Sequence, residues 1–198
     1  MYSKEQLEKA LGLLGKKLEL KNSPLLKLVV CGGSSLIISG LVSRATKDVD
    51  VVAIGSMDEK GNLIFKSPLP VPDILINTVR EAAHDLGLQE NWLNPEPESI
   101  MQAGLPEGFI KRAEGRNYGS KLKIFFLGRF DLIHLKVFAG ADQGPGRHVD
   151  DLLALKPSEN EMESAAKWSM KQDPSEGFRY VLKDMLEKLG YGSVCERI

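Results

Sequence analysis

Apolar residues recur along this chain with two different spacings, and each spacing predicts a different kind of element. Leucines at every third or fourth position near the N-terminus predict an amphipathic helix that ends near residue 19. Ser3 and Gln6 have the spacing of a capping box at the start of this helix. Mostly apolar runs instead predict buried strands, and these runs cover 25–31, 48–54 and 122–127.

The remaining apolar positions mostly follow helical spacing. A turn at 58–62 precedes a short apolar segment, 63–65, which is predicted to pair back as a strand, and glycines at 140–146 predict a loop. Further helices are predicted over 35–41, 73–87, 131–139 and 147–155, after the capping box at Ser158 and after Pro174, with short helices near 96–103 and 106–113.

Strands come early in this order and helices come late, which predicts an α+β fold. We expect a small mixed β-sheet core flanked by helices, with a helical C-terminal half. Residues 1–155 are expected to form this core, including the N-terminal helix. Residues 156–198 are expected to form a helical extension packed on the same core.

The composition is that of an ordinary globular protein, with 42% hydrophobic and 27% charged residues among 198. A formal net charge of −1 provides no global basic field, so it neither demands nor excludes RNA as a partner. Cys31 and Cys195 lack C-x-x-C spacing, and the three histidines lack metal-ligand spacing, which argues against a zinc site. We expect a cytoplasmic protein without a membrane span, because no apolar run reaches about 20 residues.

Two carboxylates one residue apart follow a glycine-rich turn, and this arrangement is the main candidate for chemistry. Residues i and i+2 of a strand point to the same face, so Asp48 and Asp50 would converge on one side. Two unpaired like charges this close repel each other. A hard cation such as Mg²⁺, which binds oxygen ligands together with phosphates, would relieve the repulsion.

The turn itself is Gly32-Gly33-Ser34, between a predicted strand and a predicted helix. Backbone N–H groups at a helix start form an anion site. Each of the two features has an ordinary alternative. The glycine turn could be a plain strand-to-helix turn, and the acid pair could mark a solvated strand edge. Placing both acids at the start of a buried strand is costly without compensation, so the combination indicates phosphoryl or nucleotidyl transfer.

Cationic and polar residues near these acids extend the candidate site. Arg44 could direct its guanidinium at phosphate or at the acid pair, or could be a surface loop residue, and Thr46 could be an ordinary strand residue. Lys136 lies in an apolar stretch and could neutralise phosphate charge, while Asp151 could add a third carboxylate. The alternative for these two residues is an ion pair between adjacent helices. Asp131 is predicted to be an N-cap.

Taken together, these residues resemble the nucleotidyltransferase superfamily with its polymerase-β-like fold. More narrowly, they resemble a small bacterial family related to AbiEii-type toxin nucleotidyltransferases. The likeness covers most of residues 25 to 190. The residues that carry it are Gly32-Gly33-Ser34, Arg44-x-Thr46-x-Asp48-x-Asp50, Trp92-Leu93-Asn94, Asp131-Leu132 with Lys136 and Ala139, Asp151-Leu152 with Leu155, and then Pro157, Glu161, Ala165 and Trp168.

This resemblance implies transfer of a nucleoside monophosphate from an NTP to RNA, a protein or a small molecule, with Mg²⁺ or Mn²⁺. Asp48 and Asp50 would hold the metal and act in catalysis, and Lys136 would offset developing charge. Asp151, or Asp150, would complete the acidic cluster. The nucleotide would be bound by Gly32, Gly33, Ser34, Arg44 and Thr46. Possible partners are tRNA or another protein as acceptor, and an antitoxin.

One departure from the superfamily leaves alternatives open. Many members carry a third carboxylate on a later strand, but 121–127 contains no acid. Either Asp131 or Asp151 substitutes for it, or the protein is a catalytically degenerate nucleotide-binding or regulatory partner in a toxin–antitoxin pair. A purely structural module, with the two aspartates paired to Arg44 and Lys47, is a third alternative. The long interval between Ser34 and Asp48 also requires the loop 39–47 to fold back.

Overall fold

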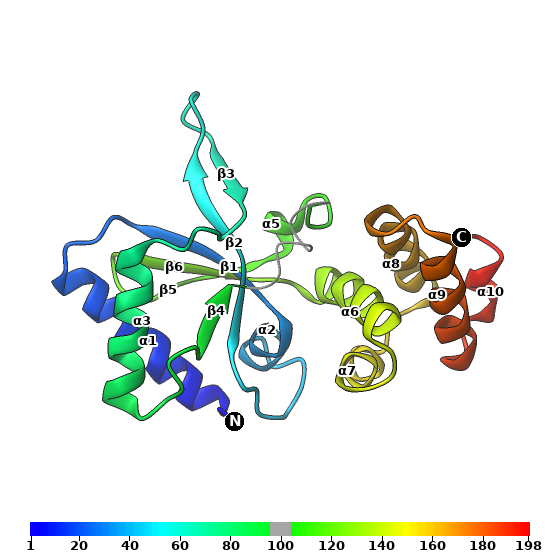
Figure 1. Ribbon diagram of the computed structural model, residues 1–198, viewed down its shortest axis with the longest axis horizontal. Coiled ribbons are helices and arrows are strands. Elements are labelled where there is room, and N and C mark those ends of the chain that lie inside the picture. The colour runs from blue at the N-terminus through cyan, green and yellow to red at the C-terminus, as the bar shows by residue number, and fades with distance from the viewer. Residues whose placement is uncertain (96–103) are drawn as a thin grey trace. The chain divides into compact units, whose positions relative to one another are not determined.

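The computed structural model describes residues 1–95 and 104–198 (Figure 1). By their contacts, these residues form two compact units. The first unit comprises Met1–Gly104 and Ile110–Gly128, and the second comprises Leu105–Phe109 and Arg129–Ile198. The short segment Leu105–Phe109 thus belongs to the second unit although the chain on either side of it belongs to the first. Each unit is described by itself.

A mixed sheet forms the centre of the first unit, in agreement with the predicted α+β fold. Its order in the described residues is β3-β2-β1-β6-β5, and β4 pairs with the start of β2. β1 runs antiparallel to β2 and parallel to β6. The strands are β1 (Leu26–Cys31), β2 (Val49–Met57), β3 (Leu63–Lys66), β4 (Leu93–Pro95), β5 (Glu114–Asn117) and β6 (Leu122–Phe126).

The pairing register of β2 decides which of its side chains enter the core. Val30 lies opposite Val51 and Leu28 lies opposite Ile54, and all four side chains belong to the hydrophobic core. A register shift between Val29 and Val30 accommodates one extra residue of β2. Because side chains alternate along a strand, Asp50 and its partner Cys31 face the opposite side of the sheet.

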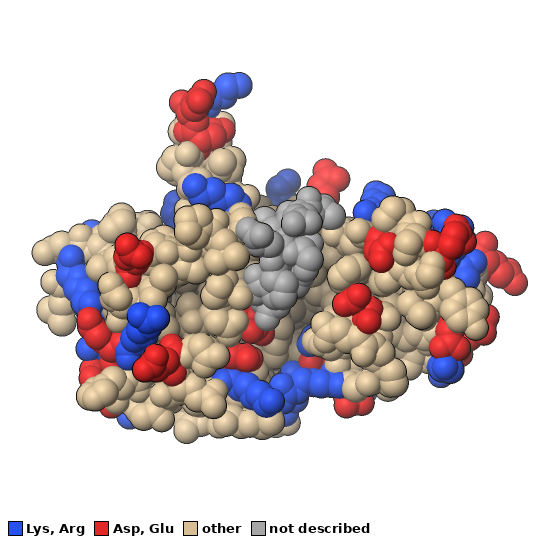
Figure 2. All heavy atoms as spheres, viewed as in Figure 1, with Lys and Arg blue, Asp and Glu red and all other residues tan. Residues whose placement is uncertain are grey.

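Two long helices cover the core side of this sheet. α1 (Lys4–Leu20) and α3 (Asp73–Leu86) pack against each other. The periodic leucines of α1 are fully buried; they are Leu7, Leu11, Leu14 and Leu18. The predicted capping box at Ser3 and Gln6 is confirmed. The first unit also contains α2 (Gly32–Ile38) and most of α5 (Phe109–Arg112). β2 and β3 form a projecting hairpin whose tip carries both acidic and basic side chains (Figures 1 and 2).

The second unit is helical in its described residues, as the sequence predicts for the C-terminal half. α6 is its centre, because it packs against α7, α8 and α9. The capping box of Ser158 and Glu161 at the start of α8 is confirmed. The helices are α6 (Arg129–Gln143), α7 (Arg147–Leu155), α8 (Glu159–Gln172), α9 (Glu176–Lys188) and α10 (Gly192–Cys195).

Several predicted boundaries were wrong. α2 begins at Gly32 rather than near residue 35, because the Ser34 and Ser35 hydroxyls donate to the strand-end carbonyls of Cys31 and Val30 at 3.0 and 2.7 Å. Asp131 is not an N-cap: α6 begins two residues earlier, and Asp131 is buried in its first turn. α6 also continues to Gln143, into the predicted loop.

Other differences concern short elements. β4, β5 and α10 were not predicted, and only 109–112 of the helix predicted over 106–113 is helical. The short helix predicted near 96–103 lies outside the described residues. No helix in the described ranges combines the length and the hydropathy needed to cross a membrane.

Candidate functional site

The glycine turn after β1 lies directly against the carboxylate of Asp50. Gly32 has a φ of +67°, a conformation that favours glycine, and a Cβ atom placed on it would lie 2.3 Å from Asp50 Oδ2. A Cβ atom on Gly33 would lie 2.6 Å from Thr46 Oγ1 and 3.0 Å from Arg44 Nη2. The structure therefore brings together five predicted site residues, which are Gly32, Gly33, Arg44, Thr46 and Asp50.

This proximity has two structural causes. In the β1–β2 pairing, Asp50 lies opposite Cys31, the residue just before the turn. The loop between α2 and β2 folds back, as its length required, because Thr46 forms an isolated β-bridge with Tyr2. The Tyr2 N–H donates to the Thr46 carbonyl at 2.6 Å, and the Thr46 N–H donates to the Tyr2 carbonyl at 3.1 Å.

The polar side chains at the turn differ in how far they are exposed. Arg44, Asp48 and Asp50 are partly exposed, whereas Thr46 is buried. Arg44 Nη1 donates to the Ala45 carbonyl at 2.9 Å, which holds the guanidinium beside the turn. Asp48 lies one residue before β2, so β2 begins after the first of the two acids.

The Ser34 side chain is buried at the turn. Its hydroxyl is fully buried and donates to Cys31, so the hydroxyl is engaged inside the fold. As in any helix, the first N–H groups of α2 have no partner within the helix itself. Gly32 is partly exposed, whereas Gly33 and Ser34 are buried, so a ligand at this turn would meet the backbone at Gly32. The Arg44 guanidinium lies against Gly33.

The donor set fits a magnesium ion that is shared with a substrate. Mg²⁺ commonly binds through one or two carboxylates together with substrate phosphates. The Asp50 carboxylate lies against the glycine turn and is a ligand of this type, whereas Asp48 lies two residues earlier, before β2 begins. The described residues contain no group of three or more histidine, cysteine, aspartate or glutamate side chains that could hold a metal ion.

Lys136 and Asp151, predicted from the sequence as a second group, pair with each other between α6 and α7. Lys136 Nζ lies 2.8 Å from Asp151 Oδ2, and the two residues are 5% and 3% exposed. Lys136 Nζ also lies 3.4 Å from Nδ1 of His148, whose Nε2 lies 3.0 Å from Gln143 Oε1. Burial, and next the charge of Lys136, lowers the pKa of His148. These contacts are those of an ion pair between adjacent helices.

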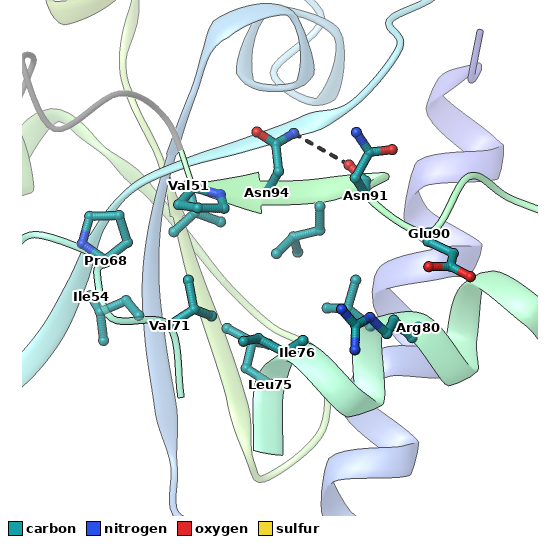
Figure 3. Close-up of a pocket in the computed structure, with 13 residues that line it drawn as sticks. Val51, Ile54, Pro68, Val71, Leu75, Ile76, Arg80, Glu90, Asn91 and Asn94 are labelled. Carbon is teal, nitrogen blue, oxygen red and sulfur yellow. Dashed lines mark hydrogen bonds between the residues drawn. The ribbon is translucent and has the colours of Figure 1, made fainter. Parts of the chain in front are cut away.

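Sequence reasoning missed an apolar cavity of about 320 Å³ in the first unit (Figure 3). Leu75 and Ile76 of α3 line one side, and Asn91 and Asn94 lie on the side of β4. The helical periodicity of α3 predicted its apolar side, but β4, which completes the cavity, gave no clear strand signal. A wider hollow of about 670 Å³ includes Arg44 in its lining. Neither of these two cavities is lined by Asp48 or Asp50.

Comparison with protein families identifies the family of the chain. A family model described as a nucleotidyltransferase of unknown function (DUF6036) matches residues 9–146, which is more than half of the chain. The chain belongs to this family. The part matched to the nucleotidyltransferase family contains the glycine turn, both aspartates and Lys136, and ends before Asp151. No curated protein and no solved structure matched the chain.

Proposed function

We propose that this protein is a metal-dependent nucleotidyltransferase that transfers a nucleoside monophosphate from an NTP to an acceptor hydroxyl or phosphate. The observation that carries the proposal is the contact between the Gly32 turn and the Asp50 carboxylate, in a chain of a nucleotidyltransferase family. A backbone turn that can approach phosphate and a carboxylate that can hold its metal lie within one β1–α2–β2 unit.

Each residue at the turn has a defined role in this reaction. The backbone of Gly32, Gly33 and Ser34 binds the triphosphate, with the Arg44 guanidinium beside it. Thr46, which is buried against Gly33, positions the loop. Asp48 and Asp50 would hold Mg²⁺ or Mn²⁺, which would supply neutralisation of phosphate charge. The acceptor oxygen forms a bond to the α-phosphorus and loses its proton, while the bond to the β-phosphate breaks and pyrophosphate leaves.

Lys136 and Asp151 have a finer part in the same proposal. Lys136 would offset negative charge on a phosphate, and Asp151, or Asp150, would supply a further carboxylate. Because Lys136 pairs with Asp151 at 2.8 Å, this role requires Lys136 to exchange the carboxylate for phosphate. Asp150 is exposed on α7 and is the more accessible of the two acids.

We also place the protein in the toxin-like, AbiEii-related branch of nucleotidyltransferases. The proposal rests on the resemblance carried by Arg44 and Thr46, which lie against Gly33. An NTP is the substrate on this proposal. An antitoxin is the expected protein partner.

A second candidate is a catalytically degenerate, nucleotide-binding partner of a toxin–antitoxin pair. One observation favours it. Among the described strands, only β2 presents a carboxylate on the face where Asp50 lies, since Glu114 of β5 pairs with Phe126 on the core side. No described strand therefore supplies a base for the acceptor hydroxyl.

Label transfer from an NTP tests the proposal. The protein is incubated with α-labelled NTPs, Mg²⁺ and either total RNA or a protein fraction. The proposal expects label on an acceptor, lost in Asp48→Asn and Asp50→Asn but kept in Asp142→Asn, a matched change at an exposed site on α6. Binding of Mg²⁺–NTP without transfer supports the degenerate partner, and no binding contradicts both candidates.

A further inference from the structure

The sheet face opposite α1 and α3 carries paired lysines and aromatic rings. It is formed by Lys27 of β1, Phe65 of β3, and Lys123 and Phe125 of β6, which we call the basic–aromatic face. All four side chains are partly exposed. They alternate with core residues along their strands, so they point to the same side as Asp50.

Two glycines allow the side chains of this face to lie close to the sheet. A Cβ atom on Gly55 would lie 2.9 Å from Lys27 Cβ and 3.3 Å from Phe65 Cε1, and one on Gly115 would lie 3.4 Å from Phe125 Cε1. The rings of Phe65 and Phe125 meet edge to face, with centroids 5.6 Å apart. The two rings, which come from β3 and β6, therefore form one aromatic pair on this face.

Among the described residues, the two lysines have no acidic partner. Lys27 and Lys123 lie directly opposite each other in the β1–β6 pairing, an arrangement in which like charges repel. Neither forms an ion pair with another described residue, although Lys123 Nζ lies 5.0 Å from the centroid of Phe125. At positions of the described strands that face this side, the only acid is Asp50. The described side chains of this face therefore favour binding of an anionic ligand.

We propose that the basic–aromatic face binds single-stranded nucleic acid, which is then the acceptor for nucleotidyl transfer. Phosphates pair with the lysines and bases stack on the phenylalanines, a combination that binds single strands without sequence preference. Lys27 is four positions along β1 from Cys31, which lies opposite Asp50, so the lysines are about 13 Å from the acid along the strand. A nucleic-acid strand bound along β1 would therefore have its end directed toward the glycine turn. The role of the nucleic acid as acceptor rests on the proposed function, whereas its binding to this face does not.

Fluorescence anisotropy with a labelled short oligoadenylate, as RNA and as DNA, tests the binding. Lys27→Gln with Lys123→Gln should weaken binding and reduce the slope of log K against log salt by about 1.4, since each phosphate contact to a single strand contributes about 0.7. Phe125→Leu should weaken binding about fivefold or more while leaving that slope unchanged. Lys16→Gln, an exposed lysine on α1, is the matched control and should bind like wild type.

Two results would overturn the proposal. One is that the wild-type protein binds no oligonucleotide, or that the double lysine variant binds it as tightly as wild type does. The other is displacement by polyglutamate as effective as displacement by oligoadenylate, which would indicate an acidic protein ligand. Preferential binding of either RNA or DNA supports the proposal and identifies the acceptor type.

A nucleotide titration separates this proposal from the proposed function. The double lysine variant should bind Mg²⁺–NTP as wild type does, because neither lysine belongs to the glycine turn. If oligonucleotide binding fails while NTP binding persists, the acceptor assignment alone falls. If NTP binding fails while the lysine-dependent oligonucleotide binding persists, the face remains a nucleic-acid site and the enzymatic proposal falls.

Discussion

At the scale of single residues, the site requires glycine at positions 32 and 33, because a Cβ atom at either position would collide with a side chain of the site. Gly32 has a left-handed backbone conformation, and its missing Cβ leaves the space that the Asp50 carboxylate approaches. A side chain at this position would be strained by its backbone and would also displace the carboxylate. The residue therefore combines a requirement of the turn with a requirement of the site.

Gly32→Ala is expected to reduce the free energy of unfolding by about 1–2 kcal/mol or more, the usual cost of a left-handed non-glycine residue. It should also weaken Mg²⁺–NTP binding, because Asp50 must move. Urea unfolding and calorimetry measure the two effects. Gly12→Ala is the control: nothing lies within 4 Å of its added Cβ, so α1 should gain up to about 1 kcal/mol. Equal behaviour of the two variants would contradict the account.

The buried pair of Lys136 and Asp151 gives a second prediction at this scale. Lys136→Met leaves a buried carboxylate without its partner and should cost about 3–5 kcal/mol of stability. Lys136→Met combined with Asp151→Leu should recover most of that loss. Lys188→Met, which breaks the exposed pair with Asp184, should change stability little. A double variant as unstable as the single one would show that the pair is not what the single change disrupts.

At the scale of elements, α6 and α7 are joined by a network in which His148 is favoured in its neutral form. Burial and the nearby Lys136 charge lower the pKa of His148 in the folded state. The unfolded chain therefore binds more protons than the folded chain just below the ordinary histidine pKa of about 6.5. Folding stability is consequently lost as the pH falls through this range.

His148→Gln should remove this part of the pH dependence. Wild type is expected to be less stable at pH 5 than at pH 7.5, and the variant should show a smaller difference between the two values. Chemical unfolding at both pH values measures the change. A variant whose stability depends on pH as strongly as that of wild type would mean that other groups cause the dependence.

Local signals explain which elements could be predicted from the sequence. The two capping boxes and the buried leucine spacing of α1 involve neighbouring residues, so their elements were found. β4 and β5 were missed because each is short and has turn-like residues: Asn94 and Pro95 in β4, and Gly115 and Asn117 in β5. They form strands because β2 and β6 offer them free edges, which is a tertiary effect.

At the scale of the whole molecule, the candidate site was only partly predictable. The glycine turn and the acids were recognisable because they belong to one short stretch of chain. The positions of Arg44 and Thr46 beside Gly33 depend on the bridge between Thr46 and Tyr2, which no local pattern indicates. Likewise, the Lys27–Lys123 pairing depends on the parallel register of strands almost a hundred residues apart in the sequence.

At this scale, the net charge of the molecule must be distinguished from the charge of a local surface. The net charge of −1 indicates no general affinity for polyanions. On the face seen in Figure 2, acidic and basic side chains are interspersed. Any binding of nucleic acid must then come from a defined local surface, as the basic–aromatic face provides.

Calorimetric titration of the protein with an NTP, with and without Mg²⁺, tests the central claim most directly. The account predicts binding that requires Mg²⁺, is lost in Asp50→Asn and is retained in Asp142→Asn, with all three proteins equally folded. Binding that persists without Mg²⁺ or in Asp50→Asn, or no binding by the wild-type protein, would contradict the claim that the glycine turn and Asp50 form a nucleotide site.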